Sequence, residues 1–344
     1  MKKSKKILIR SPNWLGDAIM TTPVIHSLKN HFPKSKISVL AKPGVASLFE
    51  ASPDVDQVII YRKPGIHQGI PGKWRLSREL KKFSFDSAII FPHSFESALI
   101  SYLSRIPVRI GYATEGRGFL LSDRPDLSRR RKQEHQVPFF FHLLEPLGIL
   151  ENPSEKKNPL CLTIPDSARI QAKARLKELS IESDNFLIAL APGAMYGPAK
   201  CWPMDRFEEI AKGLKKEMGA QIIVLGTKQD ALSGRSLGNE TFHNLLGETS
   251  LTEALALLQQ CKLMICNDSG LMHAASAMNI PLIALFGPTN LDRTGPWGGV
   301  SRIVKKEFPC SPCTSKVCKK SPTCMEAITV DEVIENAVSL AKEL

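Results

Sequence analysis

Several loops of this 344-residue chain contain acidic, basic or histidine side chains that could take part in catalysis, and the first of them contains Asp17. This loop, SPNWLGDA at residues 11–18, follows an apolar run and opens a predicted helix. Asp17 could act as a general base on a hydroxyl group within hydrogen-bond reach, or it could simply stabilise the first helical turn. The loop lacks the glycine fingerprint of dinucleotide-binding dehydrogenases, and the chain has no P-loop motif.

A second loop, PGAMYGPAKCWP at residues 192–203, is rich in glycine and proline and also follows an apolar run. These residues predict a rigid turn that lets the backbone approach a ligand closely, for example at Gly193. Lys200 could offer a point charge to a phosphate, although a solvated surface lysine is the alternative. The loop FGPTN at 286–290 follows another apolar run and is expected to wall the same cleft.

A third loop belongs to the segment CNDSGLMH, which ends an apolar run and begins a predicted helix. Backbone N–H groups and the helix dipole bind anions in that geometry. Ser269 and Gly270 leave the helix N-terminus open to a diphosphate, and His273 lies one turn further on. Asp268 could instead be a plain N-cap, and His273 a core residue with its hydrogen bonds satisfied.

Cysteine and acidic clusters add two further candidates. Four of the eight cysteines follow a C-x2-C-x4-C-x5-C pattern at Cys310, Cys313, Cys318 and Cys324. This spacing allows a tetrahedral zinc site or an iron–sulfur centre, with reduced structural thiols or a disulfide as alternatives. The D-x-D sequence of Asp54–Asp56 precedes an apolar run, so we interpret it as a turn and not as a metal motif.

A repeating alternation of apolar runs and helical patterns places these loops. Strands are expected at 6–10, 37–41, 55–61, 85–91, 186–192, 221–226, 243–247, 262–268 and 281–287. Helices are expected at 17–31, 43–50, 74–82, 94–103, 203–218, 250–260, 270–278 and 330–344. Strand followed by helix, repeated, is typical of βαβ units on a parallel sheet, and ligands bind such sheets at the carboxyl ends of the strands.

The fold class predicted from this pattern is α/β, with two Rossmann-like, doubly wound parallel-sheet domains facing a central cleft. A polar, basic, proline-bearing region at about 122–165 separates the two halves. The expected domains are therefore 1–165 and 166–328, and a C-terminal helix at 329–344 completes the chain. We expect the aromatic run Phe139–Phe141 to be buried where the domains join.

Composition and net charge limit the kinds of binding partner and the location that can be expected. The chain carries 46 Lys+Arg against 34 Asp+Glu, a net charge of +12, and 43% of its residues are hydrophobic. No apolar run reaches the length of a membrane span, and no signal-peptide core follows the basic start, so we expect a cytoplasmic protein. The charge suits a nucleic acid, an anionic membrane surface or a phosphorylated substrate.

Together, the motifs SPNWLGDAIMTTP, PGAMYGPAKCWP, NDSGLMHAA and ALFGPT resemble those of the bacterial heptosyltransferase family, glycosyltransferase family 9, most closely its heptosyltransferase II branch. The resemblance covers almost the whole chain and implies a glycosyltransferase of the GT-B type. It implies that the N-terminal domain binds the acceptor and the C-terminal domain binds ADP-heptose.

By the same resemblance, Asp17 is the catalytic base and Lys200 contacts the donor phosphates. The donor pocket is implied to be lined by Gly193, Asp268, Ser269, Gly270 and His273. The implied reaction is an inverting transfer of L-glycero-D-manno-heptose, without a required metal cofactor, to the heptosyl-Kdo2-lipid A inner core of lipopolysaccharide. A first-heptose transferase and a GT-B enzyme using another nucleotide sugar are the alternatives, and a basic nucleic-acid-binding protein is a remote one.

Acceptor recognition is expected from polar and basic residues of the first half. His93, Ser94 and Arg117 are the chosen candidates, and further basic candidates are Arg62, Lys63, Lys73, Arg75 and Arg78. The segment Arg129–Lys132 could face an anionic leaflet, where each charge contributes about 1 kcal/mol. We therefore expect a peripheral position on the cytoplasmic face of the inner membrane, with no nucleic-acid partner.

Overall fold

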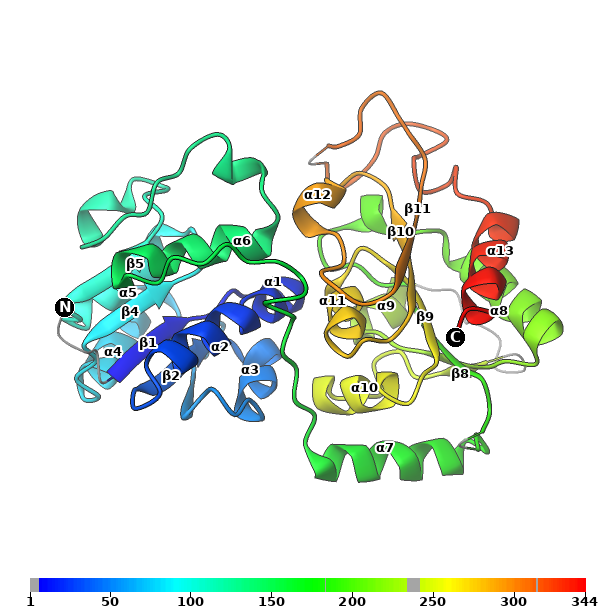
Figure 1. Cartoon of the computed structure of the whole chain (residues 1–344), viewed down its shortest axis with the longest axis horizontal. Coiled ribbons are helices and arrows are strands. Elements are labelled where there is room, and N and C mark those ends of the chain that lie inside the picture. Colours follow the sequence, from blue (N-terminus) through cyan, green and yellow to red (C-terminus); the bar gives the residue numbers. More distant parts are fainter. Residues whose placement is uncertain (1–5, 183, 234–241, 314) are drawn as a thin grey trace. The chain divides into compact units, whose positions relative to one another are not determined.

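A computed structural model describes residues 6–182, 184–233, 242–313 and 315–344 of the chain. The chain divides into two compact units, Met1–Thr163 and Ile164–Leu344. Each unit is an α/β structure built on one parallel sheet (Figure 1). Among the described residues, no helix is both long and apolar enough to cross a membrane.

The first unit contains a five-stranded sheet in the order β3-β2-β1-β4-β5, with all neighbouring pairs parallel. Its strands are β1 (Lys6–Arg10), β2 (Lys36–Ala41), β3 (Gln57–Ile60), β4 (Ser87–Ile90) and β5 (Val108–Gly111). Its α-helices are α1 (Leu15–Met20), α2 (Thr22–His31), α3 (Pro43–Glu50), α4 (Gly69–Lys81), α5 (Phe95–Leu103) and α6 (Gln136–Phe141). Short 3-10 helices are η1 (Arg117–Leu120), η2 (Arg131–Gln133) and η3 (His142–Leu147).

Helices cover both faces of this first sheet because its strands are apolar on both sides. Leu8 of β1 belongs to a core that includes Leu76 and Leu80 of α4, and α4 packs against α5. Ile7 and Ile9, which alternate with Leu8, are equally buried. On the other side of the sheet, α1 contacts α2, α3 and α6 (Figure 1).

The second unit contains a six-stranded parallel sheet in the order β11-β10-β9-β6-β7-β8. Its strands are β6 (Leu187–Ala191), β7 (Gln221–Val224), β8 (His243–Asn244), β9 (Leu263–Asn267), β10 (Leu282–Phe286) and β11 (Ser301–Lys305). Its helices are α7 (Asp166–Glu178), η4 (Pro198–Lys200), α8 (Met204–Met218), α9 (Lys228–Ser233), α10 (Leu251–Leu258), α11 (Gly270–Ala277), α12 (Leu291–Thr294) and α13 (Val330–Ala341).

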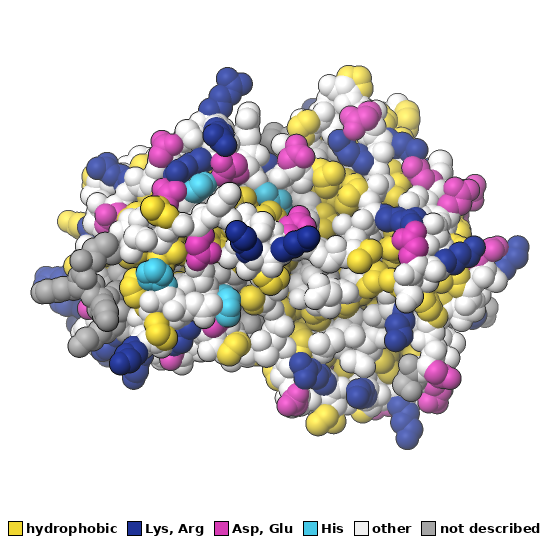
Figure 2. Space-filling view, viewed as in Figure 1, with side chains coloured by type: hydrophobic (Ala, Val, Ile, Leu, Met, Phe, Trp, Pro, Cys, Tyr) yellow, Lys and Arg dark blue, Asp and Glu magenta, His cyan; other side chains and the backbone are white. Residues whose placement is uncertain are grey.

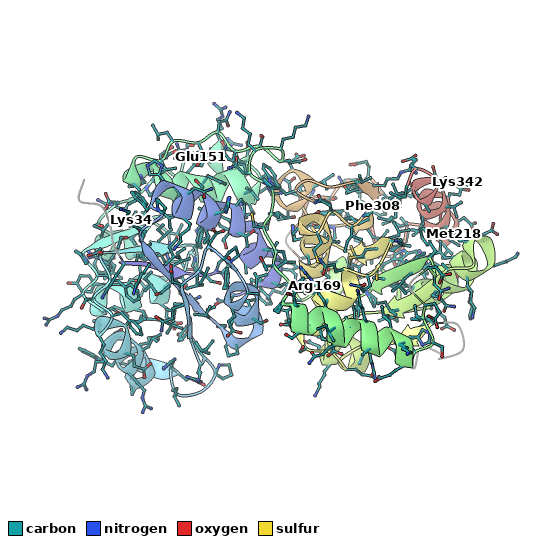
Figure 3. All side chains as sticks on the ribbon, turned by 60° about the horizontal axis from the view of Figure 1, so that its bottom comes forward. Lys34, Glu151, Arg169, Met218, Phe308 and Lys342 are labelled. Carbon is teal, nitrogen blue, oxygen red and sulfur yellow. The ribbon has the colours of Figure 1, made fainter. Side chains whose placement is uncertain are left out.

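Two helical layers cover the second sheet. The apolar faces of α8 and α13 pack together on one side, over a core formed by strands β6, β7, β9, β10 and β11. Helix α10 contacts α7 and α11 on the other side (Figure 1). In Figure 3, Met218 marks the end of α8 and Lys342 follows the end of α13. Both layers leave the carboxyl ends of the strands to the loops.

Several elements differ from the expected ones. The single helix expected at 17–31 is two helices, because the chain turns at Thr21 and Pro23 lies in the first turn of the next helix, which begins at Thr22. Strands β5 and β11 and helices α7, α9 and α12 were not expected. The unit boundary after Thr163 lies two residues before the one expected after residue 165. Phe139–Phe141 are buried within the first unit, where Phe139 stacks on Tyr112 with ring centroids 4.4 Å apart.

Candidate functional site

Three loops of the second unit meet at the carboxylate of Asp268, directly after β9. Its Oδ2 accepts a hydrogen bond from Lys200 Nζ at 2.6 Å and another from Thr289 Oγ1 at 2.6 Å. Lys200 ends the loop after β6, and Thr289 lies in the loop after β10. Both hydrogen bonds are charge-assisted because the acceptor is a carboxylate. Asp268 is only 5% exposed, so little water competes with them.

A second polar side chain fixes the loop that carries Lys200. Asn267 is fully buried, accepts a hydrogen bond from the Trp202 amide at 3.1 Å and donates one to the Pro192 carbonyl at 2.6 Å. The Trp202 indole N–H also donates to the Ile328 carbonyl at 3.0 Å. Both ends of the loop are therefore tied to the sheet core, which holds the Lys200 backbone in place.

The N-terminus of α11 lies beside this junction. Ser269 is the N-cap residue, but its side chain forms no capping hydrogen bond, and its Oγ is shielded from solvent without a partner among the described residues. His273, one turn along the helix, is 3% exposed. A helix start with open N–H groups, a buried hydroxyl, an imidazole and a nearby lysine is suited to a diphosphate.

Gly193 occupies a position where the backbone is crowded. A Cβ atom there would overlap the carboxylate of Asp230, which accepts hydrogen bonds of 2.7 Å from the Thr227 amide and hydroxyl. Glycine therefore lets the loop after β6 approach the start of α9. Gly193 was a candidate from the sequence, whereas Asp230 was not, and Thr289 entered only as part of the FGPTN loop expected to wall the cleft.

Asp17 lies at the carboxyl edge of the first sheet, in the first turn of α1. Trp14 is the N-cap residue of that helix and offers no side-chain cap, so Asp17 is not an N-cap. Its side chain is partly exposed, as a general base that meets a substrate hydroxyl must be. The geometry is thus compatible with both interpretations, first-turn acid and base.

A cationic cluster surrounds Glu96 at the same edge. Its lysines Lys63 and Lys73 were candidates from the sequence, but Glu96 was not. Glu96 accepts hydrogen bonds from Tyr61 Oη at 2.6 Å and Lys63 Nζ at 2.6 Å, and Lys73 Nζ lies 3.2 Å away. Burial alone would raise the pKa of Glu96, but hydrogen bonds from Lys63, Tyr61 and Lys73 lower it to about 2. Glu96 is therefore ionised throughout the physiological range.

Two more cations stand next to this cluster. Arg10, the last residue of β1, is 4% exposed, and burial lowers its pKa to about 10 while Tyr61 and Glu96 oppose that shift. Its guanidinium lies 5.2 Å from the Tyr61 ring centroid, and its Nε has no partner among the described residues. Burial, followed by the charges of Arg10 and Lys63, lowers the pKa of Lys42. Four cations thus stand near one carboxylate.

The three chosen acceptor residues have different environments. His93 and Ser94 are partly exposed at the carboxyl end of β4, and the His93 ring stacks on Tyr112 at 5.8 Å. Arg117 is fully buried and donates to the carbonyls of Tyr112 at 2.8 Å and Ser94 at 3.0 Å. The expectation that Arg117 contacts the acceptor directly is therefore corrected: the side chain is enclosed, and it positions residues 92–97 instead.

The four clustered cysteines line one small cavity, although among the described residues no group of three or more His, Cys, Asp or Glu is arranged as a metal site. All eight cysteines are free thiols. The D-x-D sequence is part of a turn, as interpreted: Asp56 accepts from the Ile37 amide at 2.8 Å, and Asp54 lies 2.9 Å from His26.

Two Rossmann-like parallel sheets, an anion-receptive helix start on one and a base-like carboxylate on the other, are typical of GT-B glycosyltransferases. The chain belongs to glycosyltransferase family 9 (heptosyltransferase), whose sequence model matches residues 73–323. This confirms the family and the fold class that the motifs predicted.

Individual relatives agree with this membership. The chain is 33% identical over 307 residues to lipopolysaccharide heptosyltransferase 2 of Salmonella typhimurium, with 87% of this chain and 88% of that protein covered. It superimposes on the structure of Escherichia coli ADP-heptose lipopolysaccharide heptosyltransferase II with a TM-score of 0.81 and 28% identity, covering 98% and 99% of the two chains. A family 9 glycosyltransferase structure from Veillonella parvula gives a TM-score of 0.88 at 24% identity over 99% and 98% of the chains, which shows the shared fold.

Proposed function

We propose that this enzyme transfers L-glycero-D-manno-heptose from ADP-heptose to the heptosyl-Kdo2-lipid A inner core of lipopolysaccharide. Similarity to proteins named lipopolysaccharide heptosyltransferase 2 supports heptose transfer in core biosynthesis. The observation that carries the chemistry is the Lys200–Asp268–Thr289 junction beside the open start of α11. It supplies fixed positive charge and N–H donors where the diphosphate of a nucleotide sugar would lie.

The reaction follows from these groups as an inverting displacement. Asp17 accepts the proton of the acceptor hydroxyl while that oxygen attacks the anomeric carbon of the heptose. The bond between that carbon and the diphosphate oxygen breaks, and ADP leaves with the bonding electron pair. Lys200, His273 and the N-terminus of α11 stabilise the charge that develops on the leaving phosphate.

We assign donor binding to the second unit and acceptor binding to the first. The helix start at Ser269 supports the donor assignment. Arg10, Lys42, Lys63 and Lys73 support the acceptor assignment, because the inner core is rich in carboxylates and phosphates. Glu96 pairs with Lys63 and Lys73, and its charge opposes the lowering of the pKa of Arg10 and Lys42. This concentration of four cations around one carboxylate favours an anionic sugar at the carboxyl edge of the first sheet.

Transfer from ADP-L-glycero-D-manno-heptose to Kdo2-lipid A, with and without one heptose already attached, tests the proposal. Leaving Mg²⁺ and Mn²⁺ out of the buffer tests independence from an added divalent cofactor in the same experiment. We expect product only with the heptosylated acceptor. Product on the bare acceptor would make the enzyme a first-heptose transferase, and failure on both would point to another nucleotide sugar.

We further propose that α4 docks on an anionic lipid surface, which would bring the enzyme to its membrane-linked acceptor. Lys and Arg are interspersed with Asp and Glu over the face seen in Figure 2, so net charge alone selects no docking site. On the segment 66–78, however, Ile66, Ile70 and Trp74 are 49%, 73% and 55% exposed. Ile70, Trp74 and the exposed Arg78 follow one another at intervals of four residues and therefore share one helical face.

Charge complementarity favours anionic lipid on this face, because exposed basic side chains surround its apolar side chains. Arg62, Arg75 and Arg78 are exposed, and Arg75 lies 3.8 Å from Glu79. The segment expected to face the leaflet also has exposed basic residues, but its Arg131 is engaged by Glu145 at 2.8 Å and no exposed large apolar side chain lies within it. Lys63 and Lys73, from the same stretch of chain as the apolar residues, reach the Glu96 cluster. Docking would thus place lipid close to the proposed acceptor edge.

Sedimentation with vesicles of phosphatidylcholine, with and without phosphatidylglycerol, tests this surface. We expect binding that requires the anionic lipid, and an Ile70→Ser/Trp74→Ser variant should lose most of it. Ile170→Ser is the matched control, since Ile170 is a 68% exposed isoleucine on α7 of the other unit. Equal binding by the two variants would rule out α4 as the docking surface.

A further inference from the structure

We propose that Cys310, Cys313, Cys318 and Cys324 together bind one thiophilic divalent metal ion, and that this ion holds in place the two loops that carry Lys200 and Thr289. The metal site stands independently of the activity. Its effect on the donor loops rests on the proposed function, because it concerns the binding of ADP.

Convergence of the four thiols on one cavity is the first observation. All four side chains line the same small cavity in the segment between β11 and α13, although they are spread over fifteen residues of chain. Phe308, labelled in Figure 3, precedes the segment and lines the same cavity. The other four cysteines of the chain do not line it.

The chemistry of the donor set selects the kind of ion. Four thiolates suit Zn²⁺ or Fe²⁺ and not the hard cations Mg²⁺ or Ca²⁺, which prefer oxygen ligands. Four thiolates around a divalent ion leave two negative charges, and the segment carries three exposed lysines, Lys316, Lys319 and Lys320. Lys320 also lines the cavity. The described thiols do not yet enclose an ion, so binding must draw them together across the cavity.

Contacts between the cysteine segment and the loop after β6 are the second observation. The Ala199 amide donates to the Lys316 carbonyl at 3.0 Å, next to Lys200 in the sequence. A Cβ atom at Gly197 would lie 2.7 Å from that same carbonyl, so the two backbones are in close contact. Lys316 Nζ also lies 5.9 Å from the centroid of the Tyr196 ring.

The loop after β10 is held from the same segment. The Cys313 amide donates to the Pro288 carbonyl at 2.6 Å, and Ser311 Oγ donates to the Gly287 carbonyl at 2.9 Å. A Cβ atom at Gly287 would lie 3.0 Å from Cys324 Sγ. Thr289 follows directly, so one segment supports the loops of both hydrogen-bond donors to Asp268.

An ion that cross-links residues 310–324 would restrict this segment and, through these contacts, the ammonium of Lys200 and the hydroxyl of Thr289. Groups that orient a site through such supporting contacts commonly change affinity by about tenfold to a hundredfold when they are removed. The segment therefore acts on the donor site by positioning, since the side-chain hydrogen bonds to Asp268 in the described part of the chain come from Lys200 and Thr289 and not from its cysteines.

Native mass spectrometry and elemental analysis of the full chain, purified anaerobically without chelator, test the metal site. We expect one Zn²⁺ or Fe²⁺ per chain, lost in Cys313→Ser and Cys318→Ser but kept in the control Cys161→Ser, which alters a partly exposed thiol of the other unit. A folded wild-type chain without metal would overturn the site. A metal-free mass lower by 2 or 4 Da, the mark of one or two disulfides, would overturn it as well.

Calorimetric titration of ADP separates the second part of the proposal from the first. Removal of the metal from the wild-type chain should weaken ADP binding by about tenfold or more, and adding back Zn²⁺ or Fe²⁺ should restore it. Unchanged ADP affinity after metal loss would overturn the effect on the donor loops and leave the metal site intact. A metal-loaded wild-type chain that binds no ADP would instead refute the proposed function.

Discussion

Removing the ammonium of Lys200 should weaken both the fold and the donor site, and the two losses can be separated. Lys200→Met leaves the Asp268 carboxylate buried with the Thr289 hydroxyl as a neutral hydrogen-bond donor and without the Lys200 ammonium. The Lys200 side chain is 13% exposed and that of Asp268 5%, so solvent cannot replace the lost charge fully. Breaking a buried pair by removing one partner costs about 3–5 kcal/mol. We expect the free energy of unfolding to fall by about 3 kcal/mol.

The double variant Lys200→Met/Asp268→Asn distinguishes structure from function. Its stability should return to within about 1 kcal/mol of the wild type, because no unpaired charge remains. ADP affinity should stay at least about tenfold to a hundredfold weaker, which corresponds to the loss of at least one charge-assisted hydrogen bond to phosphate. Urea unfolding and calorimetric ADP titration measure the two quantities. Wild-type stability of Lys200→Met, or restored ADP affinity in the double variant, would refute this reasoning.

Three further predictions test other parts of the molecule. Asp17→Asn should abolish heptose transfer while ADP affinity stays unchanged, and near-normal turnover would remove Asp17 from the role of base. The depressed pKa of Glu96 stabilises the fold fully above its ordinary value near 4.5, and this stability is lost as the pH falls toward about 2. Glu96→Gln should therefore reduce the loss of stability that urea unfolding shows between about pH 5 and 2; an unchanged profile would contradict it. Gly197 has φ +151°, and a Cβ atom there would meet the Lys316 carbonyl, so Gly197→Ala should lower the free energy of unfolding by about 1–3 kcal/mol and lower Tm accordingly. Gly44 has open space around its Cβ position, so Gly44→Ala should not lower Tm.

Central strands could be predicted from the sequence because they are buried on both faces and appear as continuous apolar runs. Two of the edge strands, β5 and β11, could not, because Arg109, Arg302 and Lys305 interrupt the pattern and an edge strand tolerates polar side chains that reach solvent. The other two edge strands, β3 and β8, lie within predicted strand ranges. Helix α7 was missed for a similar reason. It buries only Ala168, Ala172 and Leu176, which is too narrow an apolar stripe to stand out among its charged residues.

The proposed donor residues Asp268, Ser269 and Gly270 could be located from the sequence because they directly follow a strand and lie within one short motif. Partners from different loops could not: Glu96 meets Lys63 and Tyr61 from 33 and 35 residues away. The burial of Arg117 could not be predicted either, because an arginine is usually exposed. Its burial depends on carbonyls of the loops around Tyr112 and Ser94, and no sequence pattern shows that they converge.

A carboxylate at the centre of an anion site needs a physical reason, and the lysine provides it. An ammonium has three N–H donors, and Asp268 takes one of them at 2.6 Å. The remaining two are then fixed in direction and can face two phosphate oxygens without a further loss of side-chain entropy. Thr289 holds the same carboxylate oxygen, so Asp268 cannot follow Lys200 toward the ligand. Asp268 reduces the net positive charge of the site, but it fixes the direction of the Lys200 ammonium before the donor binds. Such preorganised charge stabilises a leaving group most effectively.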